Sequence, residues 1–405
     1  PSMERLVCDC ADLTHEQERS FVNALLQELE IELGSAEERR TLATFIHMAH
    51  DFVRECHIFR MRVSIRDIMR AVQLFRYFRH SAAGRAVAYL AFDGVESVQQ
   101  QQADKRVYSN LYWSSLILSL GMAYFLRLPV KVGARRMRDE FANAMRTALT
   151  ATESCYYSFR DFHAVLAATL RRFYDETDIP VGIAPTAALM ENLFATVICI
   201  DAKIPVMICG PAGCSKTLSF TIAVDNMKGP ASKRPLYQRL HHLHPFRYQC
   251  SEQSTDTEIE AVYDSAIKRQ LMFEGSDDPG RCTERSAVLL DEAGLPSEDT
   301  MPLKVIHYKM DHPQVATVIL TNKLLDAAKT NRTLQVMQSE PSGEDLRALT
   351  QGCLYPQVAQ YMTEQQRAIV DGLCSAFASV KDNRMFAKPN GEDMFHLRDF
   401  IYFLR

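Results

Sequence analysis

The segment 204–219, IPVMICGPAGCSKTLS, brings together residue types that can bind a chain of phosphates. Its apolar run at 206–209 predicts a buried strand, and the small residues that follow let the backbone turn tightly. Lys216 and Thr217 come at the expected start of a helix, where free N–H groups and the helix dipole favour an anion. The pattern is the phosphate-binding loop G-x-x-x-x-G-K-S/T, with Ser215 in place of the second glycine. The alternative interpretation is a plain strand, turn and helix with a chance lysine.

Each residue type in this loop has a defined task. The loop amides would hold the phosphates, Lys216 would reach the β- and γ-phosphates, and the hydroxyl of Thr217 would bind Mg²⁺. Ser215 has less backbone freedom than glycine, so it is a departure from the pattern. The residues expected to contact the nucleotide here are Gly210, Pro211, Ala212, Gly213, Cys214, Ser215, Lys216, Thr217 and Leu218.

A second apolar segment ends in paired carboxylates. Residues 286–290 are followed by Asp291 and Glu292, which is typical of a Walker B strand. Asp291 would support the Mg²⁺ ion, and Glu292 would orient and polarise the attacking water. The alternative for such a pair is a strand that ends in a solvated acidic turn.

The apolar segment 315–321 predicts a further strand, and Asn322 follows it. If this strand neighbours the Walker B strand, Asn322 would lie beside Glu292 and could position the water or the γ-phosphate. A turn-forming asparagine is the alternative. A helix is predicted over 323–330. Arg332 after it is either a partner of the helix C-terminal dipole or an arginine finger for a neighbouring module's phosphate.

Length and composition describe an ordinary globular chain. The 405 residues suffice for two to three domains, and 47% are hydrophobic and 24% charged. The net charge of −4 does not indicate the excess of basic residues that is typical of nucleic-acid-binding proteins. No apolar run reaches the roughly 18 residues of a membrane span. The cysteines are scattered within apolar runs, which favours free thiols in the cytoplasm over a disulfide framework.

The rest of the chain predicts mostly helix. Residues 1–82 and 83–180 show helical spacing of apolar residues, 181–345 alternates strands with helices, and 346–405 returns to helix. Because the chain begins with proline and ends within an apolar segment, we expect it to be part of a longer polypeptide. Within the last segment, helices are expected over 356–365, 366–380 and from 395 onwards.

The order of these features resembles an AAA+ ATPase module. The resemblance is closer to the mysterin family, giant RING-type ubiquitin ligases with a dynein-like AAA+ core, and it covers 180–405 well and 1–180 more loosely. The motifs that carry it are GPAGCSKT at 210–217, RYQCS at 247–251, VLLDEAGL at 288–295, MPLK at 301–304, and the run from TN at 321–322 to NR at 331–332.

This resemblance implies an α/β fold, with a parallel-sheet P-loop AAA+ core, a helical lid, and an all-α region before them. Residues 1–82 would be the lid of a preceding module and 83–180 a helical connector. Residues 181–345 would be the large αβα nucleotide-binding domain, and 346–405 an incomplete small helical lid.

Further site residues follow from the resemblance. SIRD at 64–67 and HLRD at 396–399 each open an apolar helix. In AAA+ lids a sensor-2 arginine lies at such a helix start, so Arg398 would report the phosphate of this module and Arg66 that of the preceding one. The resemblance also implies that Ile183 and Ala184 pack on the adenine.

The function implied is an ATP-binding and ATP-hydrolysing module, with ATP and Mg²⁺, that couples nucleotide state to the conformation of a larger ubiquitin ligase. The alternative is a non-catalytic nucleotide-holding scaffold that supports or gates ligase activity elsewhere. A small P-loop kinase is a third and more distant alternative. Expected partners are neighbouring AAA+ modules of the same longer chain, and a ubiquitin-conjugating enzyme through parts outside this chain, since no RING-type Cys/His array is present.

Overall fold

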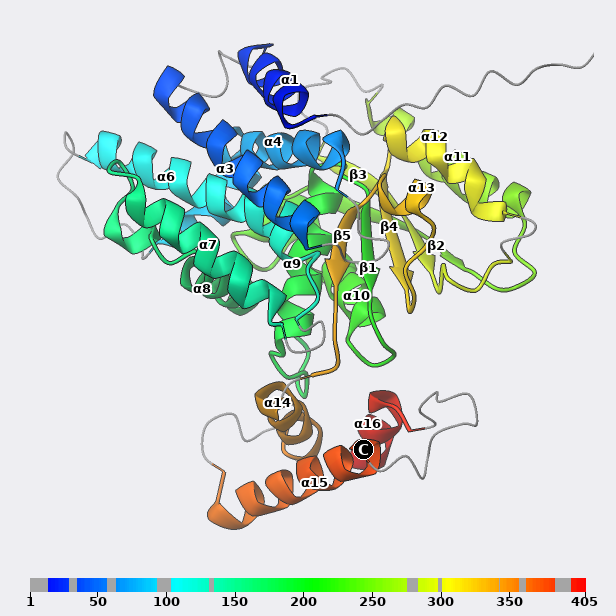
Figure 1. The fold of residues 1–405 in the computed structure, drawn as a ribbon. Coiled ribbons are helices and arrows are strands. Elements are labelled where there is room, and N and C mark those ends of the chain that lie inside the picture. Colours follow the sequence, from blue (N-terminus) through cyan, green and yellow to red (C-terminus); the bar gives the residue numbers. More distant parts are fainter. Residues whose placement is uncertain are drawn as a thin grey trace, which may run out of the picture.

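A computed structural model of the chain shows helices in the N-terminal part, a helix-covered sheet in the middle, and a small helical unit at the C-terminal end (Figure 1). The residues described are 14–28, 35–56, 63–92, 103–130, 135–274, 283–297, 301–341, 343–356, 362–382 and 395–405.

Capping residues set the starts of several N-terminal helices. Ser35 and Glu38 form a reciprocal capping box, and so do Ser64 and Asp67. A five-residue π-helical turn, Gly121–Phe125, extends the apolar helix that was expected in this region. The helices are α1 (His15–Glu28), α3 (Ala36–Glu55), α4 (Ile65–His80), α5 (Ala82–Ala88), α6 (Ala103–Leu120), α7 (Met137–Ala151) and α8 (Phe162–Asp175).

The sheet has five parallel strands in the order β2-β3-β4-β1-β5. The fold is therefore α/β, as expected. The strands are β1 (Val206–Cys209), β2 (His242–Gln249), β3 (Glu284–Asp291), β4 (Ala316–Thr321) and β5 (Leu334–Met337). The helices around it are α9 (Ala187–Asp201), α10 (Lys216–Asn226), α11 (Asp256–Glu274), α12 (Ile306–Asp311) and the short α13 (Ala327–Thr330).

Alternate residues of each strand point to opposite faces of the sheet. The central strands are buried on both faces because helices cover both. Ile208 and Val318 belong to the large core that α9 and the N-terminal helices share. Met207, Val288 and Ile319 belong to a second core with α11 and α12. This burial explains why β1, β4 and most of β3 read as continuous apolar runs, whereas β2 at the edge of the sheet is only partly buried.

The N-terminal helices pack directly onto the αβα layer. Phe78 of α4 stacks on Phe194 of α9 with ring centroids 6.4 Å apart. The hydroxyl of Tyr77 donates to Oδ2 of the buried Asp201 at 2.8 Å. Residues from α3 to α9 and from the sheet therefore share one continuous hydrophobic core.

Three C-terminal helices form a unit below the sheet in Figure 1, with a core of its own. They are α14 (Gly343–Leu354), α15 (Glu364–Asp382) and α16 (Leu397–Leu404). The sequence did not predict α14 as a separate helix. Of the helix expected over 356–365, residues 356, 362 and 363 are not helical, 364 and 365 belong to α15, and 357–361 lie outside the described residues. Thr363 sets the start of α15, because its hydroxyl and amide form a capping box with Gln366.

The helix expected over 323–330 is also shorter than predicted. Only Ala327–Thr330 is helical. Asp326 caps its first turn by accepting the N–H of Lys329 at 3.0 Å, while Leu325 is buried in the second core before the helix begins. Tertiary packing therefore keeps residues 322–326 out of the helix.

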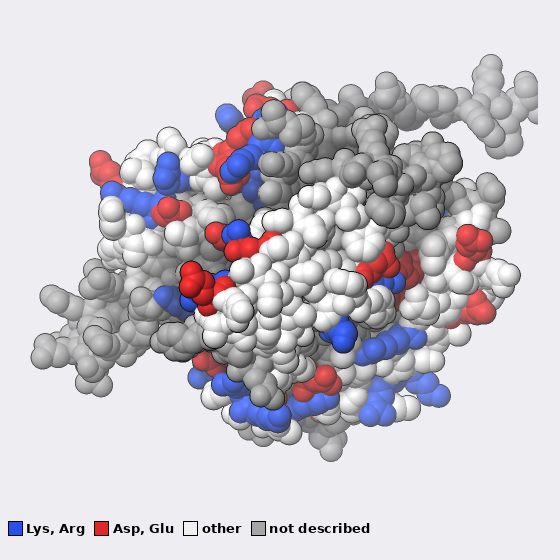
Figure 2. Space-filling model, turned by 90° about the horizontal axis from the view of Figure 1, so that it is seen from below, with Lys and Arg blue, Asp and Glu red and all other residues white. Residues whose placement is uncertain are grey.

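Charged side chains of both signs lie around a largely uncharged centre on the face seen in Figure 2. No extended single-sign area stands out there among the described residues. Within the described part of the chain, no helix is long and apolar enough to cross a membrane.

Arg138 of α7 connects the N-terminal helices to the end of the sheet through hydrogen bonds and an ion pair. Its guanidinium donates to Oε1 of Glu191 at 2.7 Å and to the carbonyl of Met337 at 2.8 Å. Its Nε donates to the carbonyl of Leu128 at 2.8 Å. Both charged side chains are about nine-tenths buried.

We predict that Arg138→Met lowers the free energy of unfolding by about 3–5 kcal/mol, because it leaves the buried Glu191 carboxylate uncompensated. Adding Glu191→Gln should recover part of this loss. Arg171→Met, which breaks an exposed pair with Asp175, is the matched control and should cost less than about 1 kcal/mol. Urea denaturation measures all four proteins, and equal losses for Arg138→Met and Arg171→Met would contradict the prediction.

Candidate functional site

The polar residues singled out in the sequence converge at one edge of the sheet. Parallel strands all end at the same edge, and β4 lies between β1 and β3. The loop 210–215 after β1, Asn322 after β4, and Asp291 and Glu292 at the end of β3 therefore face one another. The condition that the sequence left open, that the Asn322 strand neighbours the acidic strand, is met.

The 210–215 loop has the tight backbone that its small residues predicted. Gly213 has φ +94°, and a Cβ on Gly210 would lie 2.7 Å from the Cβ of Gln338, so both positions require glycine. Ser215 has φ +62° and ψ +23°, a left-handed conformation that glycine adopts more readily. The departure at Ser215 therefore leaves the loop conformation in place but strains one residue.

The ammonium of Lys216 is the best-satisfied group of the site. It donates to the carbonyl oxygens of Gly210 at 2.6 Å and Pro211 at 2.9 Å, and to Oδ1 of Asn322 at 2.8 Å. The side chain is almost wholly buried. The lysine side chain therefore turns back toward the loop backbone, where its ammonium can contact an anion bound by the loop.

Two further hydrogen bonds join the strand ends. The hydroxyl of Thr217 donates to Oδ2 of Asp291 at 3.0 Å, and Nδ2 of Asn322 donates to Oε2 of Glu292 at 2.8 Å. Glu292 has φ +52°, which is rare for a side chain of this kind. A hydroxyl beside a carboxylate is a donor set that suits Mg²⁺.

A surface cavity of about 460 Å³ opens between the loop and the ends of β4 and β5. Gly210, Pro211, Asn322 and Lys323 line it. The volume falls within the range of about 300–1,000 Å³ that is usual for ligand sites.

Sequence reasoning missed the polar residues that hold the loop from behind. Nδ2 of the fully buried Asn192 in α9 donates to the carbonyl of Cys214 at 2.9 Å. Gln338, directly after β5, donates its side-chain amide to Asn192 and Glu191 at 2.9 and 3.0 Å. The only available signal was a pair of polar residues, Glu191 and Asn192, within an otherwise apolar helix.

The C-terminal helices approach the same edge. A Cβ built on Gly213 would lie 3.2 Å from the backbone N of Arg398 at the start of α16, whose side chain is exposed. A Cβ on Gly352 of α14 would lie 3.2 Å from the Cβ of Ala184, next to Ile183. Ile183, Ala184 and Arg398 therefore all lie where the helical unit meets the αβα layer.

Arg332 lies at the opposite edge of the sheet. It comes directly before β5, whose first amide, at Leu334, bonds Pro205 at the beginning of β1. Its guanidinium donates to Oδ2 of Asp311 at 2.8 Å and to the carbonyl of Ala328 at 2.7 Å. The bond to Ala328 fits the helix-end role, and the position separates Arg332 from this chain's own loop. Arg66 also pairs with Asp311, at 3.5 Å.

Three buried cysteines, Cys209, Cys214 and Cys250, lie around the site. Burial raises the pKa of the Cys209 thiol to about 11 and that of Cys250 to about 12. Burial also raises the pKa of Cys214, against the opposing charge of Lys216. All three are therefore thiols at neutral pH, not nucleophilic thiolates.

The sheet order, the lysine-bearing loop after β1 and the acidic pair after β3 define a P-loop fold of the AAA type. A family profile described as the RNF213 AAA domain matches residues 182–345, which span the whole sheet. The chain thus contains an AAA module of the RNF213, or mysterin, family, as the resemblance suggested. Membership of an AAA family implies nucleotide binding.

Individual relatives agree with this assignment. An E3 ubiquitin-protein ligase RNF213 from Homo sapiens is 28% identical over 422 residues, all of this chain. A Danio rerio E3 ubiquitin-protein ligase, rnf213-beta, is 26% identical over 99% of the chain. A Dictyostelium discoideum protein described as an uncharacterized transmembrane protein is 33% identical over 79% of it. The chain spans only 6–8% of the length of these relatives.

We predict that Ser215→Gly raises the free energy of unfolding by about 0.5–1 kcal/mol, because glycine adopts the left-handed conformation without the clash of a Cβ. Ser215→Ala is the matched control: it removes the hydroxyl, keeps the Cβ, and should give no gain. Urea denaturation provides the comparison. A gain for the alanine variant equal to that of the glycine variant would trace the effect to the hydroxyl and contradict the prediction.

Proposed function

We propose that this chain binds ATP with Mg²⁺ and hydrolyses ATP as an AAA+ module of a larger mysterin-type ubiquitin ligase. The observation that carries the proposal is the continuous hydrogen-bond chain from Lys216 through Asn322 to Glu292. It links the phosphate-binding loop to a carboxylate that can activate water. A site that only held nucleotide would have no need of this link.

In this proposal the described side chains divide the chemistry. Lys216 exchanges its loop carbonyl partners for phosphate oxygens. Thr217 and Asp291 would hold Mg²⁺, which neutralises the phosphate charge. Glu292 orients a water and accepts its proton. Asn322 holds the side chains of Glu292 and Lys216 in position through a hydrogen bond to each. The rare backbone conformation of Glu292 is the kind of strain that functional residues often carry.

The surrounding loops and lid supply the remaining contacts. Gly210, Pro211, Ala212, Gly213, Cys214, Ser215 and Leu218 would frame the phosphates. Ile183 and Ala184 would pack on the adenine where α14 meets the core. Arg398 would sense the phosphate from the lid, which has its own hydrophobic core and can tilt as a unit.

We also propose the domain division, with 181–345 as the large domain and 346–405 as its lid. The matching capping boxes before Arg66 and Arg398 support residues 1–82 as the lid of a preceding module, with 83–180 as the connector. Because α3 and α4 share a core with the sheet, this first lid would move with residues 181–345. Arg332, at the far edge, would serve a neighbouring module's site.

The partners then follow from the length of the relatives. Neighbouring AAA+ modules of a longer chain would contact this one, and a ubiquitin-conjugating enzyme would act elsewhere on that chain. All cysteines among the described residues are free thiols, which supports our proposal of a cytoplasmic location.

We predict that Lys216→Ala weakens binding of ATP·Mg²⁺ at least ~10-fold, because a charge-assisted hydrogen bond to phosphate contributes roughly 1.5–3 kcal/mol. Isothermal titration calorimetry measures the affinity. Lys309→Ala on α12, which removes a lysine paired with Asp264 of α11, is the control and should bind as the unmodified chain does. Equal affinity for all three proteins would overturn the role of the loop.

We predict that Glu292→Gln binds ATP within a few-fold of the unmodified chain but turns it over about 10²-fold more slowly, through loss of the positioned base. Asn322 can still donate to the glutamine oxygen, so the fold should persist. Glu260→Gln, an exposed change on α11, is the control.

Phosphate release under single-turnover conditions gives the rates in this comparison. Normal turnover in Glu292→Gln would remove that residue from the mechanism. Tight binding without turnover by the unmodified chain would favour the nucleotide-holding scaffold instead.

A further inference from the structure

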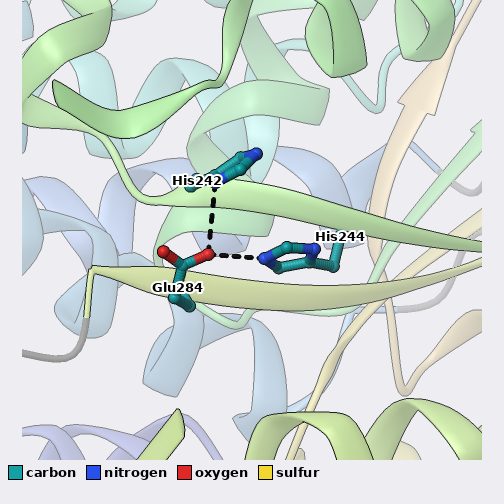
Figure 3. A group of neighbouring side chains, drawn as sticks. All are labelled: His242, His244 and Glu284. Atoms are coloured by element: carbon teal, nitrogen blue, oxygen red, sulfur yellow. Dashed lines mark hydrogen bonds and ion pairs between the residues drawn. The ribbon is translucent and has the colours of Figure 1, made fainter. Parts of the chain in front are cut away.

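A cluster of two histidines and a glutamate lies at the beginning of β2 and β3, away from the nucleotide site (Figure 3). Nδ1 of His242 lies 3.3 Å from Oε2 of Glu284, and Nε2 of His244 lies 2.5 Å from the same oxygen. All three ligand atoms lie within 4.8 Å of one another. Each side chain is only partly exposed.

The strand geometry holds this cluster in place. His242 and His244 are two residues apart on β2 and therefore point to the same face of the sheet. Glu284 is the register partner of His242 on the neighbouring strand β3. The ring of Phe273 from α11 stacks on His244 at 5.0 Å and 21°. The donor atoms are thus positioned by the fold, not by flexible surface chains.

The donor set is that of a transition-metal site. Imidazole nitrogen and carboxylate oxygen bind Zn²⁺ at about 2.0–2.2 Å, so neighbouring ligand atoms in a tetrahedral site lie roughly 3.3–3.5 Å apart. The spacing of His242 and Glu284 already has this value. An ion would replace the short hydrogen bond between His244 and Glu284, and any proton shared there would leave to solvent.

We propose that His242, His244 and Glu284 form a Zn²⁺ site, with a water at the fourth position. Such an ion would clamp β2, at the edge of the described sheet, to the neighbouring strand β3. Asp291 lies seven residues further along β3, roughly 23 Å away at about 3.3 Å per residue. The proposed clamp is therefore separate from the nucleotide site and does not depend on the proposed ATPase activity.

Local charge limits the affinity of the site. Lys228 and Arg269 lie near enough to His242 to act on it electrostatically, and Glu284 is the single negative ligand. Two cations oppose a divalent ion, so the affinity should fall below that of four-ligand structural zinc sites.

The test measures metal binding by the metal-free 405-residue chain, using Zn²⁺ in competition with a chromophoric chelator and Co²⁺ by visible absorption. We expect about one Zn²⁺ per chain, bound at least ~10-fold more weakly by His244→Gln and by Glu284→Gln. The Co²⁺ complex should show the bands of tetrahedral N/O ligation without a sulfur charge-transfer band. Zn²⁺ should also raise the midpoint of thermal unfolding in the unmodified chain.

His312→Gln, which removes an exposed histidine, is the matched control and should leave Zn²⁺ affinity unchanged. Thermal unfolding without metal checks that each variant is folded. Absence of saturable Zn²⁺ binding by the folded chain would overturn the site. Binding that survives Glu284→Gln, or that carries a sulfur charge-transfer band, would assign the metal to other residues and overturn it equally.

Discussion

The position of β4 between β1 and β3 is the constraint on which the site depends. If the acidic strand paired directly with β1, Asn322 would lie outside the gap between Lys216 and Glu292. With β4 inserted, the Asn322 amide spans that gap, accepting from the lysine at 2.8 Å and donating to the carboxylate at 2.8 Å. The parallel register brings all three strand ends to one edge of the sheet.

The hydrophobic cores do not follow the four segments that the sequence predicted: residues before 181 share a core with the sheet, and the C-terminal helices have a core of their own. The N-terminal helices are continuous with one face of the sheet, and Arg138 fastens them to the end of β5. The C-terminal helices instead form their own core and meet the sheet near Gly213 and Ala184. The junction between these two cores therefore runs beside the loop at 210–215.

The parts of the sheet that lie away from this site carry other charged and polar residues. Arg332 and Asp311 lie at the edge opposite the loop, which separates both from Lys216 and Thr217. His242, His244 and Glu284 lie at the beginnings of β2 and β3, where strand register holds them together. At the end of β5, Arg138 binds the carbonyl of Met337, and Gln338 holds Asn192, which supports the loop. These groups of residues are kept apart because strand direction and register fix which residues lie at each end of a strand.

The sequence by itself determined the strand at 206–209, the loop after it, the acidic pair and Asn322, because strong local patterns fix each of them. It also placed most helices, although it missed α14 and extended the helix before Arg332 too far, since capping by Asp326 and burial of Leu325 override local propensity there. Only the tertiary structure decided which strands are neighbours, and so that Asn322 bonds Glu292. It alone revealed the support from Asn192 and Gln338 and the cluster around Glu284, because these contacts join residues that are distant in sequence and linked only by register and packing.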